Sequence, residues 1–276
     1  MSRFGASAPI GVFDSGVGGL TVLKALAAQL PRERFVYLGD TARLPYGTKS
    51  PQTVARYALQ AARKLTEYGV KCLVLACNTA SAVGLPAVSD EVRDVPVIGV
   101  IEPGAQAAAL ASRSGHIAVI ATEGTVRGGA YQEAILRRRS DARVSAVPAP
   151  LFVALAEEGL CSGPIAQSVA RHYLQPLFDA GGDTPPPDTL VLGCTHFPML
   201  ADTIRIAAGP GVDIVDSAET TALVVRRTLE RENLAAAGGE GGLRLLATDA
   251  AERFARIGGR FLERPIRPEE VELIDL

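Results

Sequence analysis

The chain's 276 residues, 47% of them hydrophobic, are enough for one large domain or for two smaller domains with separate cores. A formal net charge of -2 provides no basic footprint for nucleic acid, and no apolar stretch reaches the roughly 20 residues needed to cross a bilayer. Since the N-terminus also lacks the features of a signal peptide, we expect a cytoplasmic protein that has neither nucleic acid nor membrane as a partner.

Short apolar runs alternate with longer helical stretches, which predicts an α/β fold with largely parallel sheets flanked by helices. In chain order, the expected strands are residues 10–13, 35–38, 72–76, 97–100, 117–121, 144–147, 190–192 and 214–215. The clearest expected helices are residues 19–30, 50–68 and 165–179. The run Pro185-Pro186-Pro187 fits neither a helix interior nor a central strand, so it predicts a stiff loop before residue 190.

An apolar strand that ends in cysteine occurs twice in the sequence. LVLACNTASA (73–82) is similar to LVLGCTHFPML (190–200), and IGVFDSGVGG (10–19) pairs more loosely with IAVIATEGTV (117–126). This internal repeat predicts two similar lobes with the active site in the cleft between them. We expect residues 1–99 and 211–276 to form the first lobe and residues 100–210 to form the second.

Polar motifs follow several of these strands. They are Asp14-Ser15-Gly16, DTARLPYG (40–47), Cys77-Asn78-Thr79 and Cys194-Thr195-His196. In an open parallel sheet, ligands bind at the carboxyl ends of the strands, so we interpret these motifs as parts of one site. At a helix start, the dipole and the unpaired backbone amides favour a thiolate and offer a cradle for a carboxylate.

The pair Cys77 and Cys194 admits three interpretations. Both can be buried packing residues, although packing does not require the repeated motif around them. Together with His196 they can form a zinc site, although no Cys-x-x-Cys or His-x-x-x-His spacing supports a metal. We favour the third interpretation, a pair of acid–base thiols. Cys72 and Cys161 lack a comparable context, and we interpret them as apolar or surface residues.

Two thiols suit a reaction that inverts a stereocentre by proton transfer. One group must remove a proton from one face of the carbon while another delivers a proton to the opposite face, which places the sulfurs roughly 7 Å apart. One thiol must be ionised while the other is protonated, so activating neighbours are expected. Asp14 and His196 are the candidates, although Asp14 can also serve simply as a helix cap and His196 as a hydrogen-bonded polar residue without a catalytic role.

Many racemases use pyridoxal phosphate, which requires a lysine for the Schiff base. The chain contains only Lys24, Lys49, Lys64 and Lys71. None of them has an obvious phosphate-binding context, and all but Lys49 are expected on exposed helices or turns. We therefore expect an enzyme that uses neither an organic cofactor nor a metal.

Taken together, these motifs resemble those of glutamate racemases, within the aspartate/glutamate racemase superfamily. The resemblance covers nearly the whole chain. It is carried by GVFDSGVGGLTVL (11–23), YLGDTARLPYGTKS (37–50), LACNTASA (75–82), GVIEPG (99–104) and GCTHFPML (193–200).

The resemblance implies a cofactor-independent interconversion of L-glutamate and D-glutamate that supplies D-glutamate for peptidoglycan synthesis, usually by a homodimer. By that likeness, Cys77 acts on the D-enantiomer and Cys194 on the L-enantiomer. The residues that match the family's substrate-contacting positions are Asp14, Ser15, Tyr46, Gly47, Asn78, Thr79, Thr195 and His196. Glu157 resembles a family glutamate near the second thiol, and Asp40 matches an acidic position of lesser importance. Ala149-Pro150 departs from the Cys-Pro of many relatives, which concerns packing more than mechanism.

Other functions remain open at this stage. A sister racemase acting on aspartate or on another acidic or cyclic substrate would keep both thiols, although the DTARLPYGTKS loop favours glutamate. A non-catalytic module that binds an acidic amino acid would not need the thiols. A lyase or decarboxylase of the same superfamily can operate with one thiol, which leaves the second unexplained.

Overall fold

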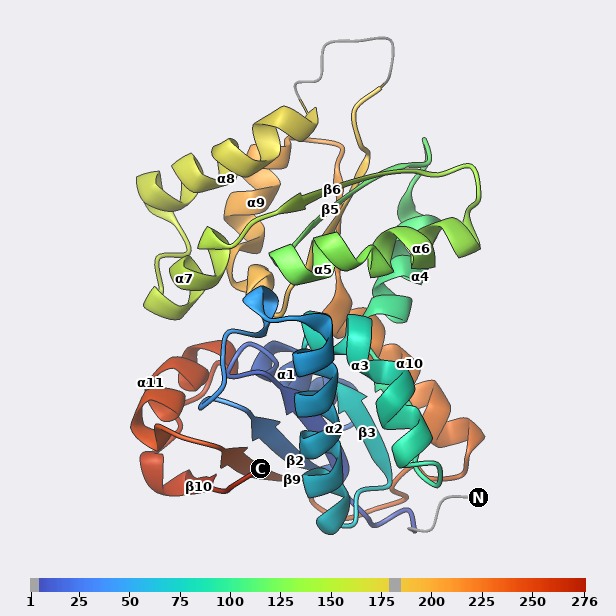
Figure 1. The fold of residues 1–276 in the computed structure, drawn as a ribbon, viewed down its shortest axis with the longest axis vertical. Helices are drawn as coiled ribbons and strands as arrows, with labels where there is room; N and C mark the ends of the chain where they lie inside the picture. Colours follow the sequence, from blue (N-terminus) through green and yellow to red (C-terminus); the bar gives the residue numbers. More distant parts are fainter. Residues whose placement is uncertain (1–4, 179–184) are drawn as a thin grey trace. The chain divides into compact units, whose positions relative to one another are not determined.

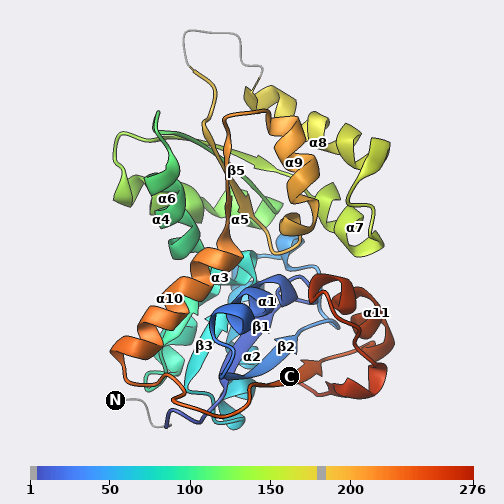
Figure 2. The same cartoon turned by 180° about the vertical axis from the view of Figure 1, so that it is seen from behind.

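The computed structural model describes residues 5–178 and 185–276, so residue 179 of the expected helix 165–179 lies outside the described residues. The chain divides into two compact units, which are seen from two sides in Figures 1 and 2. The first unit is Met1–Val100 with Ala218–Leu276, and the second is Ile101–Ser217. The second unit is therefore inserted into the first, and the chain passes between the two units twice.

The first unit is built on a 6-stranded sheet with the order β10-β9-β2-β1-β3-β4, in which all pairings are parallel. Its strands are β1 (Ile10–Asp14), β2 (Arg34–Gly39), β3 (Cys72–Leu75), β4 (Val97–Gly99), β9 (Gly242–Ala247) and β10 (Val271–Leu273). Because the strands are parallel, β1, β2 and β3 end at the same edge of the sheet, where the motifs of Asp14, Asp40 and Cys77 follow them.

Helices cover both faces of this sheet. They are α1 (Leu20–Gln29), α2 (Pro51–Glu67), α3 (Asn78–Glu91), α10 (Ser217–Arg231) and α11 (Ala251–Phe261), with 3-10 turns η1 (Tyr46–Thr48) and η3 (Pro268–Glu270). Helices α2 and α3 lie in front of the sheet in Figure 1, and α1 and α10 lie in front of it in Figure 2. Helix α2 begins where Ser50 Oγ accepts a hydrogen bond from Thr53 N (3.3 Å), with Pro51 in the first turn.

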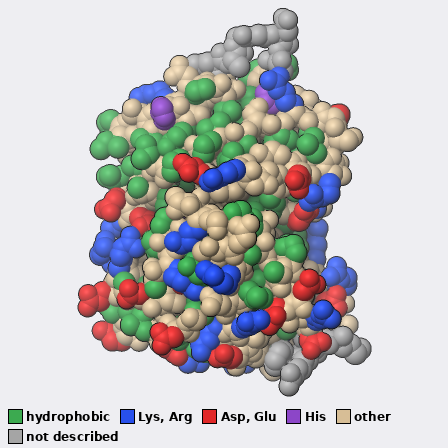
Figure 3. Space-filling view, viewed as in Figure 1, with side chains coloured by type: hydrophobic (Ala, Val, Ile, Leu, Met, Phe, Trp, Pro, Cys, Tyr) green, Lys and Arg blue, Asp and Glu red, His purple; other side chains and the backbone are tan. Residues whose placement is uncertain are grey.

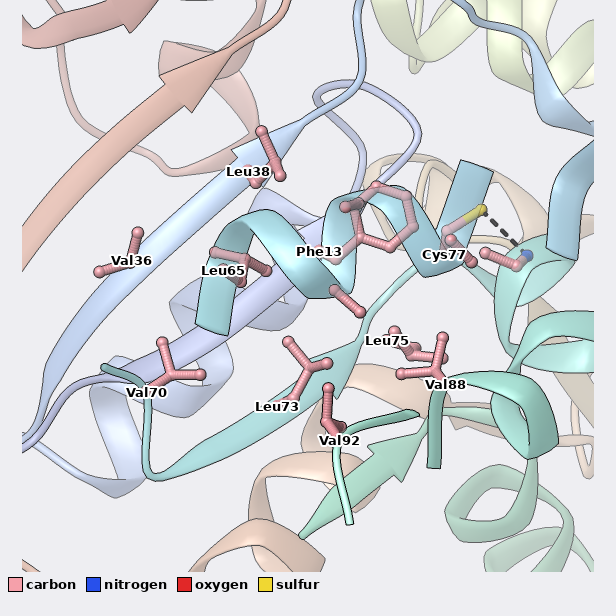
Figure 4. Close-up of a cluster of buried hydrophobic side chains, with 14 of the residues drawn as sticks. Phe13, Val36, Leu38, Leu65, Val70, Leu73, Leu75, Cys77, Val88 and Val92 are labelled. Carbon is pink, nitrogen blue, oxygen red and sulfur yellow. Dashed lines mark hydrogen bonds between the residues drawn. The ribbon is translucent and has the colours of Figure 1, made fainter. Parts of the chain in front are cut away.

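The core of the first unit lies between the sheet and α2–α3. Phe13 and Leu75 from the strands and Leu65 from α2 are fully buried in one apolar cluster, and Cys77 lies at its edge (Figure 4). Burial of large apolar side chains on both sides of β1 and β3 fixes the register of the strands. The core therefore holds the strand end that carries Cys77 in a defined position.

The second unit has a 4-stranded sheet with the order β6-β5-β7-β8, again with parallel pairings. Its strands are β5 (His116–Ala121), β6 (Arg143–Pro148), β7 (Thr189–Gly193) and β8 (Asp213–Asp216). Its helices are α4 (Ile101–Ala111), α5 (Glu123–Gly128), α6 (Ala130–Arg138), α7 (Leu151–Glu158), α8 (Gly163–Phe178) and α9 (Ala201–Ala208), with the 3-10 turn η2 (Phe197–Leu200). Helices α4 and α6 lie side by side, as do α8 and α9.

Both units contain the same strand arrangement. The order β2-β1-β3-β4 in the first unit corresponds to β6-β5-β7-β8 in the second. Cys77 follows β3 and Cys194 follows β7, so the two thiols occupy equivalent positions in two similar units. The α/β class with parallel sheets flanked by helices is confirmed.

Three features differ from what the sequence predicted. Strands β9 and β10 were not expected. Residues 211–217 were placed in the first lobe, which is wrong for β8 because this strand pairs with β7 inside the second unit. Lys71 was expected on the surface, but it is fully buried and paired with Glu33.

Charged side chains of both signs are interspersed over the visible face of the first unit (Figure 3). Over the part of the chain that is described, no helix combines the length and the apolar character needed to span a membrane. In the second unit, three large apolar residues expose 44–58% of their surface. They are Leu151 in α7, Leu160 in the turn after it, and Ile165 in α8.

Asp188 fastens the start of β7 to the loop before β5. Its carboxylate accepts hydrogen bonds from Ser112 Oγ (2.6 Å), Arg113 N (2.8 Å), Ser114 N (2.6 Å) and Thr189 Oγ1 (3.0 Å). Burial alone would raise the pKa of Asp188, but these hydrogen bonds outweigh it and hold the pKa well below its usual value.

Asp188→Asn is expected to destabilise the protein by about 1–2 kcal/mol at pH 7, since a charged acceptor is lost. A carboxyl whose pKa is lowered by folding stabilises the protein above its unfolded pKa of about 3.9, and this stabilisation is lost as the pH falls below that value. The difference in stability between variant and wild type, measured by thermal unfolding, should therefore be smaller at about pH 3 than at pH 7. Asp202→Asn is the control, because this carboxylate has 96% side-chain exposure and its surface ion pair with Arg205 contributes little, so the variant should remain close to wild type in stability. A constant difference across this pH range would contradict the prediction.

Candidate active site

In the first unit, Cys77 caps the start of α3. The sulfur accepts a hydrogen bond from the amide of Ala80 (3.5 Å), which is drawn as a dashed line in Figure 4. The thiol also donates to Ser15 Oγ at 3.5 Å, and only 6% of the residue is exposed. An amide of the first helical turn directed at the sulfur favours the thiolate, because the N-terminal end of a helix carries partial positive charge.

The turn after β1 brings Asp14 and Ser15 to this thiol. Asp14 is fully buried, and its Oδ2 accepts a hydrogen bond from Gly16 N (2.9 Å), which closes a tight turn around Ser15. A β-carbon at Gly39 would collide with the carbonyl oxygen of Gly16, so only glycine allows β2 to pass this close to the turn. The sequence motif at 14–16 therefore contacts the Cys77 motif, as the common sheet edge predicted.

The DTARLPYG loop is organised around the fully buried Asp40. Its carboxylate accepts hydrogen bonds from Arg43 Nε (2.6 Å), Thr248 Oγ1 (3.0 Å) and the phenol of Tyr46. Burial and then the charge of Asp40 raise the pKa of Tyr46 far above its usual value, so this phenol keeps its proton. Asp40 thus shapes the loop rather than contacting Cys77, and Gly47 follows Tyr46 in η1.

Asn78 and Thr79 form the first residues of α3 directly after Cys77. Both are buried, with 3% and 5% of their surfaces exposed. Their backbone amides belong to the first turn of α3, where helix amides are available to an anionic ligand. Asp14, Ser15, Cys77, Asn78 and Thr79 therefore share one edge of the first unit's sheet.

In the second unit, Cys194 lies beside an imidazole–carboxylate pair. His196 Nδ1 is 3.8 Å from Cys194 Sγ and 3.5 Å from Thr195 Oγ1, and His196 Nε2 is 3.2 Å from Glu157 Oε1. Cys194, Thr195 and His196 are all more than nine-tenths buried. A carboxylate that accepts from one ring nitrogen orients the imidazole, so that the other ring nitrogen faces the Cys194 sulfur.

Glu157 reaches His196 from the last turn of α7. This helix is held against η2 by edge-to-face packing of Phe152 on Phe197, whose ring centroids are 5.3 Å apart. The backbone amide of Phe197 donates to Cys194 O (3.1 Å), which closes the turn that carries the thiol. The second unit therefore joins all its predicted site residues in one cluster.

The remaining cysteines differ from this pair. Burial raises the pKa of the Cys72 thiol to about 12, so Cys72 remains a protonated, apolar residue of β3. Cys161 is half-buried in the turn between α7 and α8. Within residues 5–178 and 185–276, no group of three or more His, Cys, Asp and Glu side chains is placed to hold a metal ion.

Several side chains at these strand ends were not singled out from the sequence. Thr248 contacts Asp40 although the two residues are 208 positions apart, and nothing in the sequence pattern indicates this contact. Arg43 lies inside the DTARLPYG motif, so its position in the motif was an available signal. Tyr37 and Tyr131 lie inside a strand and a helix, where aromatic residues are expected for packing alone.

Comparison with known proteins agrees with this geometry. The family described as Asp/Glu/Hydantoin racemase matches residues 10–225. A glutamate racemase of Geobacter metallireducens is 50% identical over 254 residues, which are 92% of each chain. The crystal structure of glutamate racemase from Thermus thermophilus in complex with β-chloro-D-alanine has a TM-score of 0.87 and 46% identity, over 99% of this chain and 98% of that one. The Francisella tularensis glutamate racemase in complex with D-glutamate has a TM-score of 0.89 and 34% identity, over 98% of each chain.

Two similar α/β units, each with a thiol at the carboxyl end of a parallel strand, define the class of this protein as an amino-acid racemase, an isomerase. The chain belongs to the Asp/Glu/Hydantoin racemase family.

Proposed function

We propose that this chain interconverts L-glutamate and D-glutamate by proton transfer through Cys77 and Cys194, without a cofactor. The observation that carries the proposal is the equivalent position of the two thiols, each of which follows the corresponding strand of its unit and lies beside polar side chains. A single thiol would suffice for a lyase, and packing would not require acid–base neighbours at both positions.

In the proposed reaction, the Cys77 thiolate removes the α-proton of D-glutamate. The resulting carbanion takes a proton from the Cys194 thiol on its opposite face, which gives L-glutamate. The enzyme is left with a Cys77 thiol and a Cys194 thiolate, which is the state that acts on L-glutamate in the reverse direction. The scheme requires both sulfurs to reach one carbon from opposite sides, roughly 3–3.5 Å away.

The neighbours of the two thiols suit these roles. Asp14 and Ser15 lie beside Cys77, while His196 and Glu157 lie beside Cys194, so each thiol has its own acid–base support. We propose that the substrate is held by the residues that match the family's binding positions, namely Asp14, Ser15, Tyr46, Gly47, Asn78, Thr79, Thr195 and His196. The backbone amides at the start of α3 suit a substrate carboxylate.

The choice of glutamate is supported by the names of the relatives, among them the Francisella tularensis enzyme with D-glutamate. By the same family resemblance, we propose that the product D-glutamate serves peptidoglycan synthesis, and that the protein acts in the cytoplasm as a homodimer. Aspartate racemisation is the alternative, since the family description includes it.

The decisive experiment follows circular dichroism of the purified full chain with L-glutamate, D-glutamate and both enantiomers of aspartate. Exchange of the α-proton in deuterated water is followed in parallel by NMR. We expect racemisation and exchange with both enantiomers of glutamate. Faster turnover of aspartate than of glutamate would favour the sister racemase. Binding of glutamate without exchange of its α-proton would indicate a binding module that has no racemase activity.

Glu157→Gln is expected to lower kcat for glutamate by about 10–100-fold, because a charged hydrogen bond to His196 becomes a neutral one. Glu158→Gln is the matched control, since Glu158 is the next residue of α7 and is exposed to solvent. Steady-state kinetics of both variants check the prediction. Equal rates for the two variants would show that Glu157 does not support the second thiol.

A further inference from the structure

In each unit, a buried tyrosine outside the motifs of the site lies close to the thiol. Tyr37 is fully buried in β2 of the first unit, and Tyr131 is 1% exposed in α6 of the second. Neither residue belongs to the reaction scheme above. If the side chains only filled space, phenylalanine would serve as well, so the hydrogen bonds of the two hydroxyls call for an explanation.

Tyr37 fixes the turn that supports Cys77. Its phenol donates a hydrogen bond to the carbonyl oxygen of Gly16 at 2.9 Å, inside the protein. Gly16 directly follows Ser15, whose hydroxyl accepts from the Cys77 thiol, and Gly16 N bonds to Asp14. The ring of Tyr37 is itself held by Phe254, with ring centroids 6.0 Å apart. A rigid phenol therefore anchors the backbone one residue away from the partner of the thiol.

Tyr131 occupies a slot between two glycines of the second unit. A β-carbon on Gly193 would lie 3.0 Å from Cε2 of the ring, and one on Gly104 would lie 3.2 Å from Cε1. Gly193 directly precedes Cys194, so the ring packs against the backbone that enters the thiol turn. Ser217 contributes a hydrogen bond to the phenol of Tyr131.

Burial, together with nearby charges, keeps both phenols protonated. Burial, followed by the charges of Asp14 and Cys77, raises the pKa of Tyr37 well above its usual value. Burial raises the pKa of Tyr131 most, and the charges of Asp216 and Cys194 raise it further, although the Ser217 hydrogen bond opposes the shift. Both hydroxyls therefore stay neutral, and both lie within electrostatic reach of a thiol.

We infer that Tyr37 and Tyr131 are positioning residues, each for the thiol of its own unit. Tyr37 holds the Ser15 turn against Cys77, and Tyr131 holds the Gly193–Cys194 backbone in place. The importance of this for turnover rests on the proposed function, whereas the contacts themselves do not.

Tyr37→Phe and Tyr131→Phe test the inference, because each keeps the ring and removes only the hydroxyl. The alkylation rate of each cysteine by iodoacetamide is measured in the full chain by peptide mapping with mass spectrometry. We expect Tyr37→Phe to slow alkylation of Cys77 by about threefold and to leave that of Cys194 unchanged, and Tyr131→Phe to do the reverse. Each variant loses about one modest hydrogen bond that fixes the tyrosine, to Gly16 O for Tyr37 and to Ser217 for Tyr131. A change shared equally by both cysteines, or none in either, would overturn the inference.

Tyr68→Phe is the control for the substitution itself. The Tyr68 hydroxyl is 3.4 Å from Glu272 Oε1 at the surface, so both cysteines should react at the wild-type rate. Racemisation kinetics of the same variants separate this inference from the proposed function, and we expect kcat to fall at an unchanged KM. If wild type does not racemise glutamate, the proposed function fails while the alkylation pattern still decides the role of the tyrosines. If wild type racemises glutamate and the alkylation pattern is unaltered in the variants, only the positioning role fails.

Discussion

Replacing either Cys77 or Cys194 with alanine is expected to lower the rate of glutamate racemisation by about 10²–10⁴-fold, the contribution typical of one acid–base group. Each thiol serves one face of the substrate carbon, so neither can substitute for the other. The fold should survive, because both cysteines close strands whose cores are formed by other residues. Circular dichroism of the amino acid measures racemisation, and far-UV spectra of the protein check the fold.

The two single variants should also differ from each other. Cys77→Ala retains the thiol assigned to L-glutamate. This variant is therefore expected to exchange the α-proton of L-glutamate in deuterated water even though it has lost racemisation. Cys194→Ala should show the same for D-glutamate. Cys161→Ala is the matched control, since this half-buried cysteine lies outside both thiol motifs, and its rate should equal that of wild type. Near wild-type racemisation by either Cys77→Ala or Cys194→Ala would exclude the two-thiol scheme.

Lys71→Met is expected to reduce the free energy of unfolding by about 3–5 kcal/mol, because it leaves a buried carboxylate without its counter-charge. Lys71 Nζ lies 2.6 Å from Glu33 Oε2, and the two side chains are 0% and 3% exposed. Glu33 also accepts a hydrogen bond from Ala236 N (2.8 Å), and Lys71 donates to the carbonyl of Ala6. Urea denaturation followed by far-UV circular dichroism measures the loss.

A second substitution shows whether the isolated charge is the cause. Adding Glu33→Gln to Lys71→Met removes that charge while keeping an acceptor for Ala236 N, so part of the stability should return. Lys64→Met breaks an exposed ion pair with Glu67 and should leave the free energy of unfolding close to that of wild type. A Lys71→Met variant as stable as the Lys64→Met variant would contradict the prediction.

The fold was predictable where apolar runs are continuous and end in polar motifs. Strands β1, β3 and β7 are buried at every position, so their hydrophobic runs stand out in the sequence. Strand β9 is buried only at Leu245, Leu246 and Ala247, and β10 only at Val271, so neither gives a comparable signal. Strand β8 was expected, but a sequence pattern does not reveal which sheet edge a strand joins.

The candidate site was predictable to the extent that its residues follow strands. Asp14 and Cys77 were placed on one edge by this reasoning, and the structure brings them together with Ser15. The contact of Thr248 with Asp40 depends on β9 lying beside β2, which sequence spacing cannot show. Lys71 was misjudged because a lysine next to a strand is normally exposed, and only the approach of Glu33 makes its burial tolerable.

The insertion of the second unit into the first has a consequence during protein synthesis. Strand β2 pairs with β9, and the residues of β9 leave the ribosome only after the whole of Ile101–Ser217 has been made. The inserted unit can therefore complete its sheet first. Until β9 has been made, the edge of β2 in the nascent first unit is unpaired and can pair with other chains. Translation products that stop before Gly242 are accordingly expected to aggregate, whereas the segment Ile101–Ser217 contains every strand of its own sheet.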